Sequence, residues 1–384
     1  MTVTTRMKLG DDLFRNLVIH DYEYVGHGGS CTLTIGSMGS GKTTLNLKLL
    51  QRVTHLDNQK ITKSDYLDAY EERQRLETRL LENHMEPEHV LDLLPDLPCG
   101  EVPETVVYFG REFDYWHAFL EPRSWPGLTP KKVRLHIPKS EKNSLVLLVP
   151  FENGDGKDEL RRMYIDDMVQ YYANPREIIS YLQDGAINVI YPPRHYKLPD
   201  NILSMMNLSN LTERERNYTE PGWLFFEILI LLMREGYKQH YSVFADEIHD
   251  IIPMSSAGMQ WKLVDLFTRF SVELRRCQIS LFGTTHDMRL VDAKYTTRND
   301  WYIWAGGANP LKKYSVVYPA AVRRCGKGRC IIERKQIEYG YHLYERIPYQ
   351  LPKLRAYYEN TCNFSVKWCG LSTFKHKRIN NIII

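Results

Sequence analysis

The chain has 384 residues, of which 43% are hydrophobic and 25% are charged, so its composition is that of a globular protein and excludes a low-complexity or collagen-like chain. The first residues, MTVTTRMKLGDDLFR, lack the apolar segment of a secretory signal, and the longest apolar run, 223–233, is too short to cross a bilayer. The seven cysteines are odd in number and scattered, which favours a reducing compartment over a disulfide framework. We therefore expect a cytoplasmic protein without a membrane span.

The net charge of +3 hides an uneven distribution of charge along the chain. Residues 311–384 contain 15 Lys and Arg and 4 Asp and Glu, a net charge of +11, so the rest of the chain carries −8. A basic C-terminal quarter is a candidate surface for a polyanion. A solvated basic face that binds nothing explains the same pattern equally simply.

A short β-branched run at 32–35 predicts a buried strand, and it leads into the pattern G-x-x-x-x-G-K-[ST] at 36–43. Leucines at helical spacing follow at 44–50. This order predicts a phosphate-binding loop, because glycines let backbone N–H groups face a phosphate at the N-terminus of a helix. Lys42 would then contact the β- and γ-phosphates of ATP, and the Thr43 hydroxyl would bind Mg²⁺. The predicted nucleotide-binding residues are Gly36, Ser37, Met38, Gly39, Ser40, Gly41, Lys42, Thr43 and Thr44.

The middle of the chain alternates between predicted strands and helices. Residues 57–104 are rich in charge and carry an uneven apolar stripe, which predicts a helical insertion. Apolar runs predict strands at 105–109, 144–149 and 187–191, with helices at 157–172 and 175–183 between the last two. An apolar helix is expected at 223–234. The alternation predicts an α/β fold with a mainly parallel sheet flanked by helices.

The run YSVFADE at 241–247 predicts a buried strand that ends in two carboxylates. In a P-loop protein this is the Walker B element, in which Asp246 holds Mg²⁺ and Glu247 polarises the attacking water as general base. A carboxylate beside the metal-binding Asp indicates hydrolysis, since a kinase has no water to activate. A strand followed by an acidic turn is the plainer alternative.

A long amphipathic helix at 261–276 ends in Arg275 and Arg276 and leads into a strand at 279–284, which Thr285 and His286 follow. Polar groups at the carboxyl end of a parallel strand lie where ligands bind, so Thr285 and His286 are candidates to contact the γ-phosphate. The two arginines either interact favourably with the negative end of the helix dipole or include an arginine finger that contacts the ATP of a neighbouring subunit. Arg298 is another candidate for that finger.

One more strand is expected at 301–305, and four cysteines lie beyond it. Their spacings miss the short C-x2-C knuckle of a zinc site, and a thiol in the core is the simpler explanation for the one that starts an apolar run, Cys330. The sequence leaves a zinc site open for Cys325, Cys330, Cys362 and Cys369.

With these motifs in place, the chain resembles the HerA/FtsK superfamily of P-loop ATPases, ring-forming motors that pump DNA, and within it the small archaeal and archaeal-virus members. GSMGSGKT is similar to the family's Walker A motif, and YSVFADE is similar to its Walker B motif. LRRCQISLFGTTH is similar to the family's basic helix end, strand and sensor, with His286 where Gln is usual, and NDWYIWAGGANP looks like the strand and Gly-rich turn that follow.

The resemblance covers roughly 31–348 and implies a RecA-like (ASCE) core. It assigns ATP hydrolysis to Lys42, Thr43, Asp246 and Glu247, with ATP and Mg²⁺ bound, and it makes Arg275 a finger that acts on the next subunit. It also implies a homo-oligomer, a hexameric ring. We expect a lead-in at 1–30, an ATPase core at 31–348 with the insertion at about 57–104, and a basic tail at 349–384.

The leading hypothesis is a motor that hydrolyses ATP to translocate double-stranded DNA in viral or plasmid genome packaging or transfer, with a portal, capsid or nuclease as a further partner. One alternative is a morphogenesis or secretion ATPase similar to the zonula-occludens-toxin-like proteins of filamentous viruses, which normally carry a transmembrane helix. Another is a regulatory ATP switch that acts on a protein partner.

Overall fold

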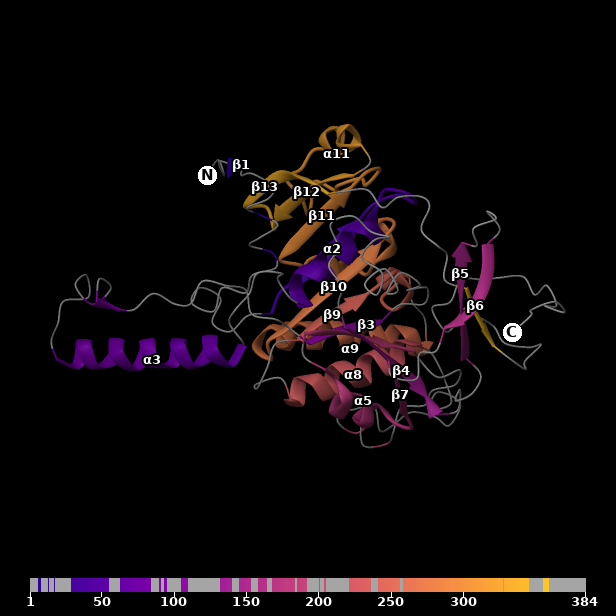
Figure 1. Ribbon diagram of the computed structural model, residues 1–384. Coiled ribbons are helices and arrows are strands. Elements are labelled where there is room, and N and C mark those ends of the chain that lie inside the picture. The colour runs from indigo at the N-terminus through magenta and orange to yellow at the C-terminus, as the bar shows by residue number, and fades with distance from the viewer. Residues whose placement is uncertain are drawn as a thin grey trace.

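The computed structural model describes residues 6–7, 13, 17, 29–54, 63–83, 90, 93–94, 105–109, 132–139, 145–152, 158–163, 168–183, 185–191, 200, 204, 221–235, 241–255, 258–326, 328–344 and 355–358. These residues form one large sheet with helices packed on it and a small second sheet beside it (Figure 1).

The large sheet has 11 described strands and is mainly parallel. In spatial order they are β1 (Arg6–Met7), β13 (Glu338–Leu343), β12 (Arg329–Arg334), β11 (Trp301–Ala305), β2 (Cys31–Ile35), β10 (Ile279–Thr285), β9 (Tyr241–Ala245), β3 (Thr105–Phe109), β8 (Ala186–Ile190), β4 (Lys132–Pro138) and β7 (Val169–Tyr172). Only β12 runs antiparallel to its neighbours, β11 and β13. The strand with the P-loop, β2, therefore lies between β10 and β11, and the Walker B strand β9 lies on the other side of β10.

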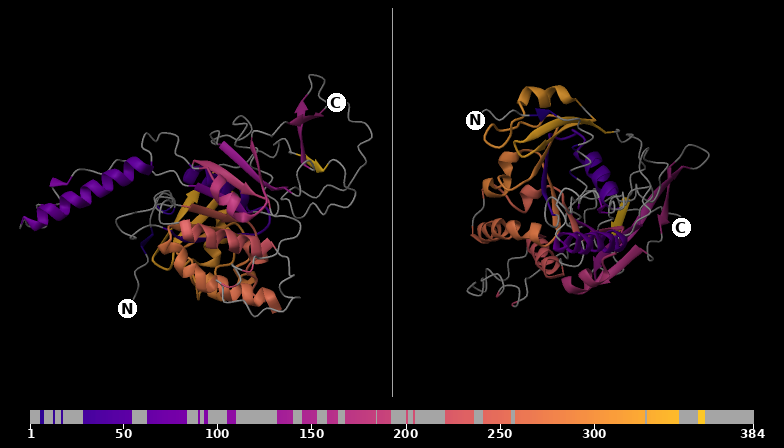
Figure 2. Two further views of the ribbon diagram at one scale, coloured as in Figure 1. Left: turned by 90° about the horizontal axis from the view of Figure 1, so that it is seen from below. Right: turned by 90° about the vertical axis from the view of Figure 1, so that its left-hand side faces the viewer.

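The helices and the second sheet complete the described part. The helices are α2 (Lys42–Thr54), α3 (Lys63–Glu82), α5 (Pro175–Tyr181), α8 (Pro221–Glu235), α9 (Gly258–Arg276), α10 (Ala293–Thr296) and α11 (Pro319–Cys325), with 3-10 turns η5 (Ile248–Asp250) and η6 (Met288–Leu290). The second sheet is antiparallel and has the order β14 (Arg355–Tyr358), β5 (Leu145–Glu152) and β6 (Asp158–Met163). In two views α3 extends away from the large sheet (Figures 1 and 2).

The central strands β2, β3, β8, β9, β10 and β11 are buried along their whole length, on both faces of the sheet, which is why they are mostly apolar. Alternate residues of β3 pack into different clusters: Val107 joins the side chains of α8 and α9, whereas Val106 joins those of α2. Helix α8 is apolar nearly all round because Leu224–Leu232 is buried in the first cluster. Within the described residues, no helix is both long and apolar enough to cross a bilayer.

Most predicted elements are confirmed, including the helix within the 57–104 insertion, but the helix expected at 157–172 is wrong where the chain is described. Residues 158–163 form β6 by antiparallel pairing with β5, and 169–172 form β7 by parallel pairing with β4. Long-range pairing overrides local preference in both segments. The strand expected near 144–149 exists as β5 but belongs to the second sheet, and β4, β12 and β13 were not anticipated.

A buried histidine on β4 makes the stability of the fold depend on pH. His136 is fully buried, its Nε2 lies 3.2 Å from Oδ1 of Asn188 on β8, and burial lowers the pKa of His136 from 6.5 to about 4. Below pH 6.5 the imidazole of His136 therefore becomes protonated in the unfolded chain, whereas in the folded chain it stays neutral down to about pH 4. This costs stability progressively as the pH falls from about 6.5 to about 4.

We predict that the wild type loses about 3 kcal/mol more unfolding free energy than His136→Gln between pH 7 and pH 4, a figure obtained from the pKa shift at 1.36 kcal/mol per unit. Urea unfolding at several pH values measures the difference. Asn188→Ala is the control, since it removes the partner but leaves the buried imidazole. Parallel pH profiles for the wild type and His136→Gln would contradict the assignment.

Candidate functional site

The carboxyl ends of β2, β9, β10 and β11 meet at one edge of the sheet, where the predicted P-loop follows β2. Neighbouring strands hold the loop in place. The N–H of Gly36 donates to the carbonyl of Thr285 (3.2 Å), and the N–H and hydroxyl of Ser37 donate to the carbonyl of Gly306 (3.2 and 3.0 Å). The hydroxyl of Tyr344 donates to the carbonyl of Ser40 (3.1 Å). The loop is therefore fixed by β10, by the turn after β11 and by the segment after β13.

Two loop glycines occupy positions that other residues would not tolerate. Gly41 has φ +98°, and a Cβ there would lie 2.7 Å from the hydroxyl of Tyr344. A Cβ on Gly36 would lie 2.8 Å from the Cβ of Ala305. Glycine is thus required in this loop for two reasons, a left-handed backbone conformation at Gly41 and close packing at both positions.

Lys42 lies against its own loop at the start of α2. Its side chain is 8% exposed, and its ammonium donates to the carbonyls of Gly36 (2.6 Å) and Ser37 (3.2 Å). Burial lowers the pKa of Lys42, and the nearby Glu247 and Asp246 oppose that shift. The cation therefore sits on the loop, facing the carboxylates that follow β9.

The two carboxylates of the Walker B segment are positioned by β10. Thr284 on β10 donates its hydroxyl to Oδ1 of Asp246 and accepts the N–H of Glu247 at 3.0 Å. The N–H of Asp246 donates to the carbonyl of Phe109 at the end of β3 (3.0 Å). Glu247 has φ 47° and ψ 52°, a left-handed conformation that costs a non-glycine residue about 1–3 kcal/mol. The sheet thus holds Glu247 in a strained turn that aims its side chain at the P-loop.

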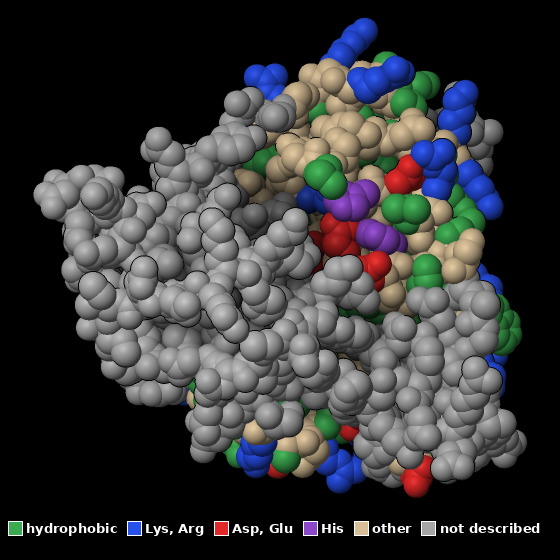
Figure 3. Space-filling view, turned by 90° about the vertical axis from the view of Figure 1, so that its right-hand side faces the viewer, with side chains coloured by type: hydrophobic (Ala, Val, Ile, Leu, Met, Phe, Trp, Pro, Cys, Tyr) green, Lys and Arg blue, Asp and Glu red, His purple; other side chains and the backbone are tan. Residues whose placement is uncertain are grey.

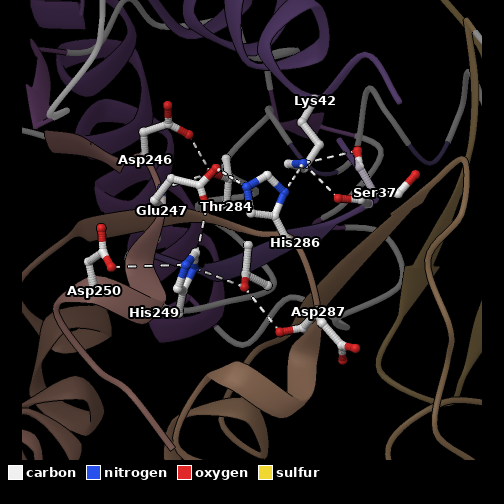
Figure 4. A network of polar contacts seen from close by, with 11 residues as sticks. Ser37, Lys42, Asp246, Glu247, His249, Asp250, Thr284, His286 and Asp287 are labelled. Atoms are coloured by element: carbon white, nitrogen blue, oxygen red, sulfur yellow. Dashed lines mark hydrogen bonds and ion pairs between the residues drawn. The ribbon is translucent and has the colours of Figure 1, made fainter. Parts of the chain in front are cut away.

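Two histidines face the two carboxylate oxygens of Glu247 (Figure 4). Nε2 of His286 lies 3.0 Å from Oε1, and Nδ1 of His249 lies 3.2 Å from Oε2. The other ring nitrogen of His286, Nδ1, lies 3.0 Å from the ammonium of Lys42. His286 therefore bridges the P-loop lysine and the Walker B glutamate.

The chemistry of Lys42 fixes the proton positions along this bridge. A lysine ammonium only donates, so Nδ1 of His286 must accept, and the N–H of the neutral ring must lie on Nε2, where it faces Glu247. Partial burial and the positive charge of Lys42 lower the pKa of His286, which favours the neutral ring. The order from donor to acceptor is thus Lys42, His286, Glu247.

His249 also contacts Thr285, through the same ring nitrogen that faces Glu247. The Thr285 hydroxyl lies 3.2 Å from Nδ1 of His249 and donates to the carbonyl of Asp287 (3.1 Å), while Nε2 of His249 lies 4.0 Å from Oδ1 of Asp250. Burial lowers the pKa of His249. Thr285 itself is fully buried, so it supports the ring next to Glu247.

The arginine candidates lie away from this cluster within one chain. Arg275 and Arg276 end α9, just before β10 begins, whereas Glu247 lies beyond the other end of β10. Seven strand residues span about 23 Å. Arg276 pairs with Glu273 (3.2 Å), Arg298 donates to the hydroxyl of Ser271 (2.8 Å), and the side chain of Arg275 lies outside the described part.

Magnesium fits the donors that the site presents. Asp246 offers a carboxylate beside the P-loop, and Thr43 is the second residue of α2, although its side chain lies outside the described part. Within the described residues no group of three or more His, Cys, Asp and Glu could hold a metal.

The cysteines give no support to a zinc site in the described residues. Cys325 and Cys330 are buried free thiols, and burial raises the pKa of each. A neutral, buried thiol is a poor metal ligand. Cys362 and Cys369 lie outside the described residues.

Sequence reasoning missed His249, Thr284, Gly306 and Tyr344. His249 follows the Walker B pair closely, but only the αL turn at Glu247 brings it back to the carboxylate. Gly306 and Tyr344 reach the P-loop through strand pairings that span more than 260 residues of sequence. Two of the four carry a signal in the sequence: Thr284 precedes Thr285 and His286, and Gly306 lies in the Gly-rich turn of the family resemblance.

No protein-family model matches the sequence, and a comparison with curated proteins gives no match. One similar solved structure is the genome-packaging NTPase B204 from Sulfolobus turreted icosahedral virus 2 in complex with sulfate, with a TM-score of 0.35, 9% identity, and 83% of this chain and 98% of that chain covered. A second is the N-terminal domain of zonular occludens toxin from Neisseria meningitidis, with a TM-score of 0.29, 11% identity, and 86% of this chain and 100% of that chain covered. A third is the flagellar accessory protein FlaH from Methanocaldococcus jannaschii, with a TM-score of 0.29, 12% identity, and 88% of this chain and 99% of that chain covered. The strand order and the P-loop geometry identify the RecA-like P-loop fold on their own.

The strained backbone of Glu247 predicts an unusual stability order. Glu247→Gly and Glu247→Ala both remove the contacts with the histidines, but only glycine adopts φ 47° without strain. We expect the Gly variant to be about 0.5–1 kcal/mol more stable than the Ala variant, after the extra unfolded-state entropy of glycine is subtracted. Urea unfolding of the two variants measures this difference. An Ala variant of equal or greater stability would show that the turn relaxes.

Proposed function

We propose that the protein is an ATPase whose hydrolytic site comprises Lys42, Thr43, Asp246, Glu247 and His286. One observation carries the proposal: the P-loop lysine and the Walker B glutamate lie on either side of one histidine, at 3.0 Å from each ring nitrogen. A kinase would need no polarising carboxylate here, whereas hydrolysis requires one to orient the attacking water. Backbone N–H groups at the N-terminus of α2, which begins at Lys42, bind the phosphates.

Binding of ATP changes the partners of Lys42. Its ammonium now donates to two loop carbonyls, and phosphate oxygens are stronger acceptors for it than neutral carbonyls. When Lys42 turns to the phosphates, Nδ1 of His286 loses its donor. Glu247 keeps its orientation through the backbone contact with Thr284 and accepts a proton from the attacking water. Mg²⁺, held by Asp246 and Thr43, would supply positive charge for the phosphate oxygens.

We further propose that hydrolysis drives translocation of double-stranded DNA, with genome packaging or transfer as the role. Two sequence features support this: the resemblance of the Walker and sensor motifs to DNA-pumping ATPases, and the net charge of +11 over 311–384. Basic surfaces bind DNA through its phosphates. A hexameric ring that binds a portal, capsid or nuclease would complete such a motor.

An arginine from a neighbouring subunit would complete the site. Arg275 and Arg276 end α9 at the opposite end of β10 from Glu247, so about 23 Å of strand separates their backbone from that residue. A finger that acts between subunits is consistent with this geometry, and Arg275 is our candidate.

Two substitutions separate binding from chemistry. Lys42→Ala should lose nucleotide binding, because it removes the cation that contacts the phosphates. Glu247→Gln should bind ATP within a few-fold of wild type but turn over at least about 100-fold more slowly, as expected for loss of a general base. Nucleotide titration and phosphate release measure the two effects. A Glu247→Gln variant that still turns over would remove Glu247 from the base role.

Long duplex DNA at low salt should stimulate ATP hydrolysis by the wild type several-fold, because a translocating motor couples the two ligands. Phosphate release with and without DNA is the measurement, and Glu247→Gln is the blank. ATPase activity that ignores DNA would favour the secretion or switch hypotheses.

Mixing Arg275→Ala subunits with Glu247→Gln subunits tests the shared site. Each variant alone should be inactive, and the mixture should regain part of the wild-type activity, because some interfaces then pair an intact Glu247 with an intact Arg275. Lack of recovery in assemblies that are otherwise intact would rule out a finger acting between subunits at this position.

A further inference from the structure

The segment between β11 and the end of β13 presents an exposed surface of a single charge. We call residues 306–344, with α11, β12 and β13, the basic lobe. All of its exposed charged side chains in the described residues are cations, and its two acidic residues, Glu333 and Glu338, are buried. The exposed cations are Lys312, Lys313, Arg323, Arg324, Arg329, Arg334 and Lys335.

These seven cations are not neutralised by acidic neighbours within the described part of the chain. None of them lies in an ion pair there; Lys313 and Arg334 instead lie over the rings of Tyr314 and Trp301. Several exposed cations outside the lobe do lie in ion pairs: Arg269 and Lys294 both reach Asp265, at 2.6 and 3.4 Å. The single charge is therefore a property of the lobe rather than of the whole surface.

The dipole of a helix explains only part of this charge. Arg323 and Arg324 lie in the last turn of α11, where cations are favoured. The other five lie in loops, in β12 or in the turn after it, and so none of them is at the C-terminus of a helix, where the dipole would favour a cation. In the space-filling view, Lys and Arg side chains gather along the upper rim, above a group of His and acidic side chains (Figure 3).

Both ends of the basic lobe are bonded to the P-loop. At its start, the carbonyl of Gly306 accepts the N–H and hydroxyl of Ser37. At its end, the hydroxyl of Tyr344 donates to the carbonyl of Ser40. A Cβ on Gly307 would lie 2.2 Å from the hydroxyl oxygen of Ser37, so this junction is also tightly packed. A displacement of the basic lobe would therefore shift Ser37 and Ser40 in the P-loop.

We propose that the basic lobe binds the phosphate backbone of double-stranded DNA and passes this contact to the P-loop through Ser37 and Ser40. The inference rests on the proposed function and locates its DNA contact on one face of the chain. Four of the seven cations are arginines, whose planar groups suit phosphate oxygens. The same surface that binds DNA then stimulates hydrolysis.

The test compares two triple variants of the full chain that remove equal charge. The lobe variant removes three of the seven cations of the basic lobe and carries Lys312→Gln, Arg323→Gln and Arg324→Gln. The control variant removes three exposed cations that are already paired with acids and carries Arg75→Gln, Arg269→Gln and Lys294→Gln. The probe is a fluorescent random duplex in a salt titration, with ATP hydrolysis measured in parallel. The lobe variant should bind at least about tenfold more weakly, and its log–log salt slope should fall by about 2–3. The control variant should match the wild type.

Basal ATP hydrolysis without DNA should be unchanged in both variants, which shows that each is folded, while the lobe variant should need more DNA for half-maximal stimulation. Equal effects of the two variants, or none, with a wild type that binds DNA, would overturn the lobe assignment alone. A wild type that neither binds nor responds to DNA would overturn the proposed substrate and the lobe's partner together. Loss of binding to phosphatidylserine vesicles, with DNA binding intact, would assign the lobe to a membrane and overturn the inference.

Discussion

The short chain of contacts from Lys42 through His286 to Glu247 is the interaction on which the site depends. It joins three separate segments, the P-loop after β2, the Walker B turn after β9 and the end of β10, at one edge of the sheet. Parallel order places these ends side by side, but the bridge requires the left-handed turn at Glu247 as well. The bond between Thr284 and the N–H of Glu247 holds that turn, and His249 faces the second carboxylate oxygen. The strain at Glu247 is therefore offset by the Thr284 bond to its N–H and by the contact of His286 with Oε1.

The antiparallel hairpin at the far side of β11 extends this site rather than merely ending the sheet. Its flanking residues Gly306 and Tyr344 bond to the P-loop, so the loop is supported from two directions by chain that comes late in the sequence. Buried Glu333 on β12 accepts from the indole N–H of Trp304 on β11 (2.7 Å) and from the N–H of Val316 (2.9 Å), which fixes the loop between β11 and α11 to the sheet. The segment that carries the exposed cations is thus bonded to the P-loop at both of its ends.

The sequence predicted the elements that follow local rules and missed those that depend on pairing. The P-loop, the Walker B strand and the apolar helix α8 are recognisable from residue type and spacing, and the structure has them. Residues 158–163 have a sequence that suggests a helix, but they form a strand that pairs with β5. The residues of this segment do not by themselves indicate that pairing partner. The same limit applies at the site: Glu247 was visible as an acidic neighbour of Asp246, whereas His249 acquires its place only from the backbone turn between them.

The protonation state of His286 tests the central claim most directly. Histidine ¹⁵N spectra of the wild type at pH 7, assigned by comparison with His286→Gln, report which ring nitrogen carries the proton. A neutral ring protonated at Nε2 is predicted, because Lys42 donates to Nδ1 and Glu247 accepts from Nε2. Lys42→Ala should then shift the Nδ1 resonance, because it removes the donor to that nitrogen. A ring protonated at Nδ1, or an imidazolium at pH 7, would contradict the bridge between the P-loop and the general base.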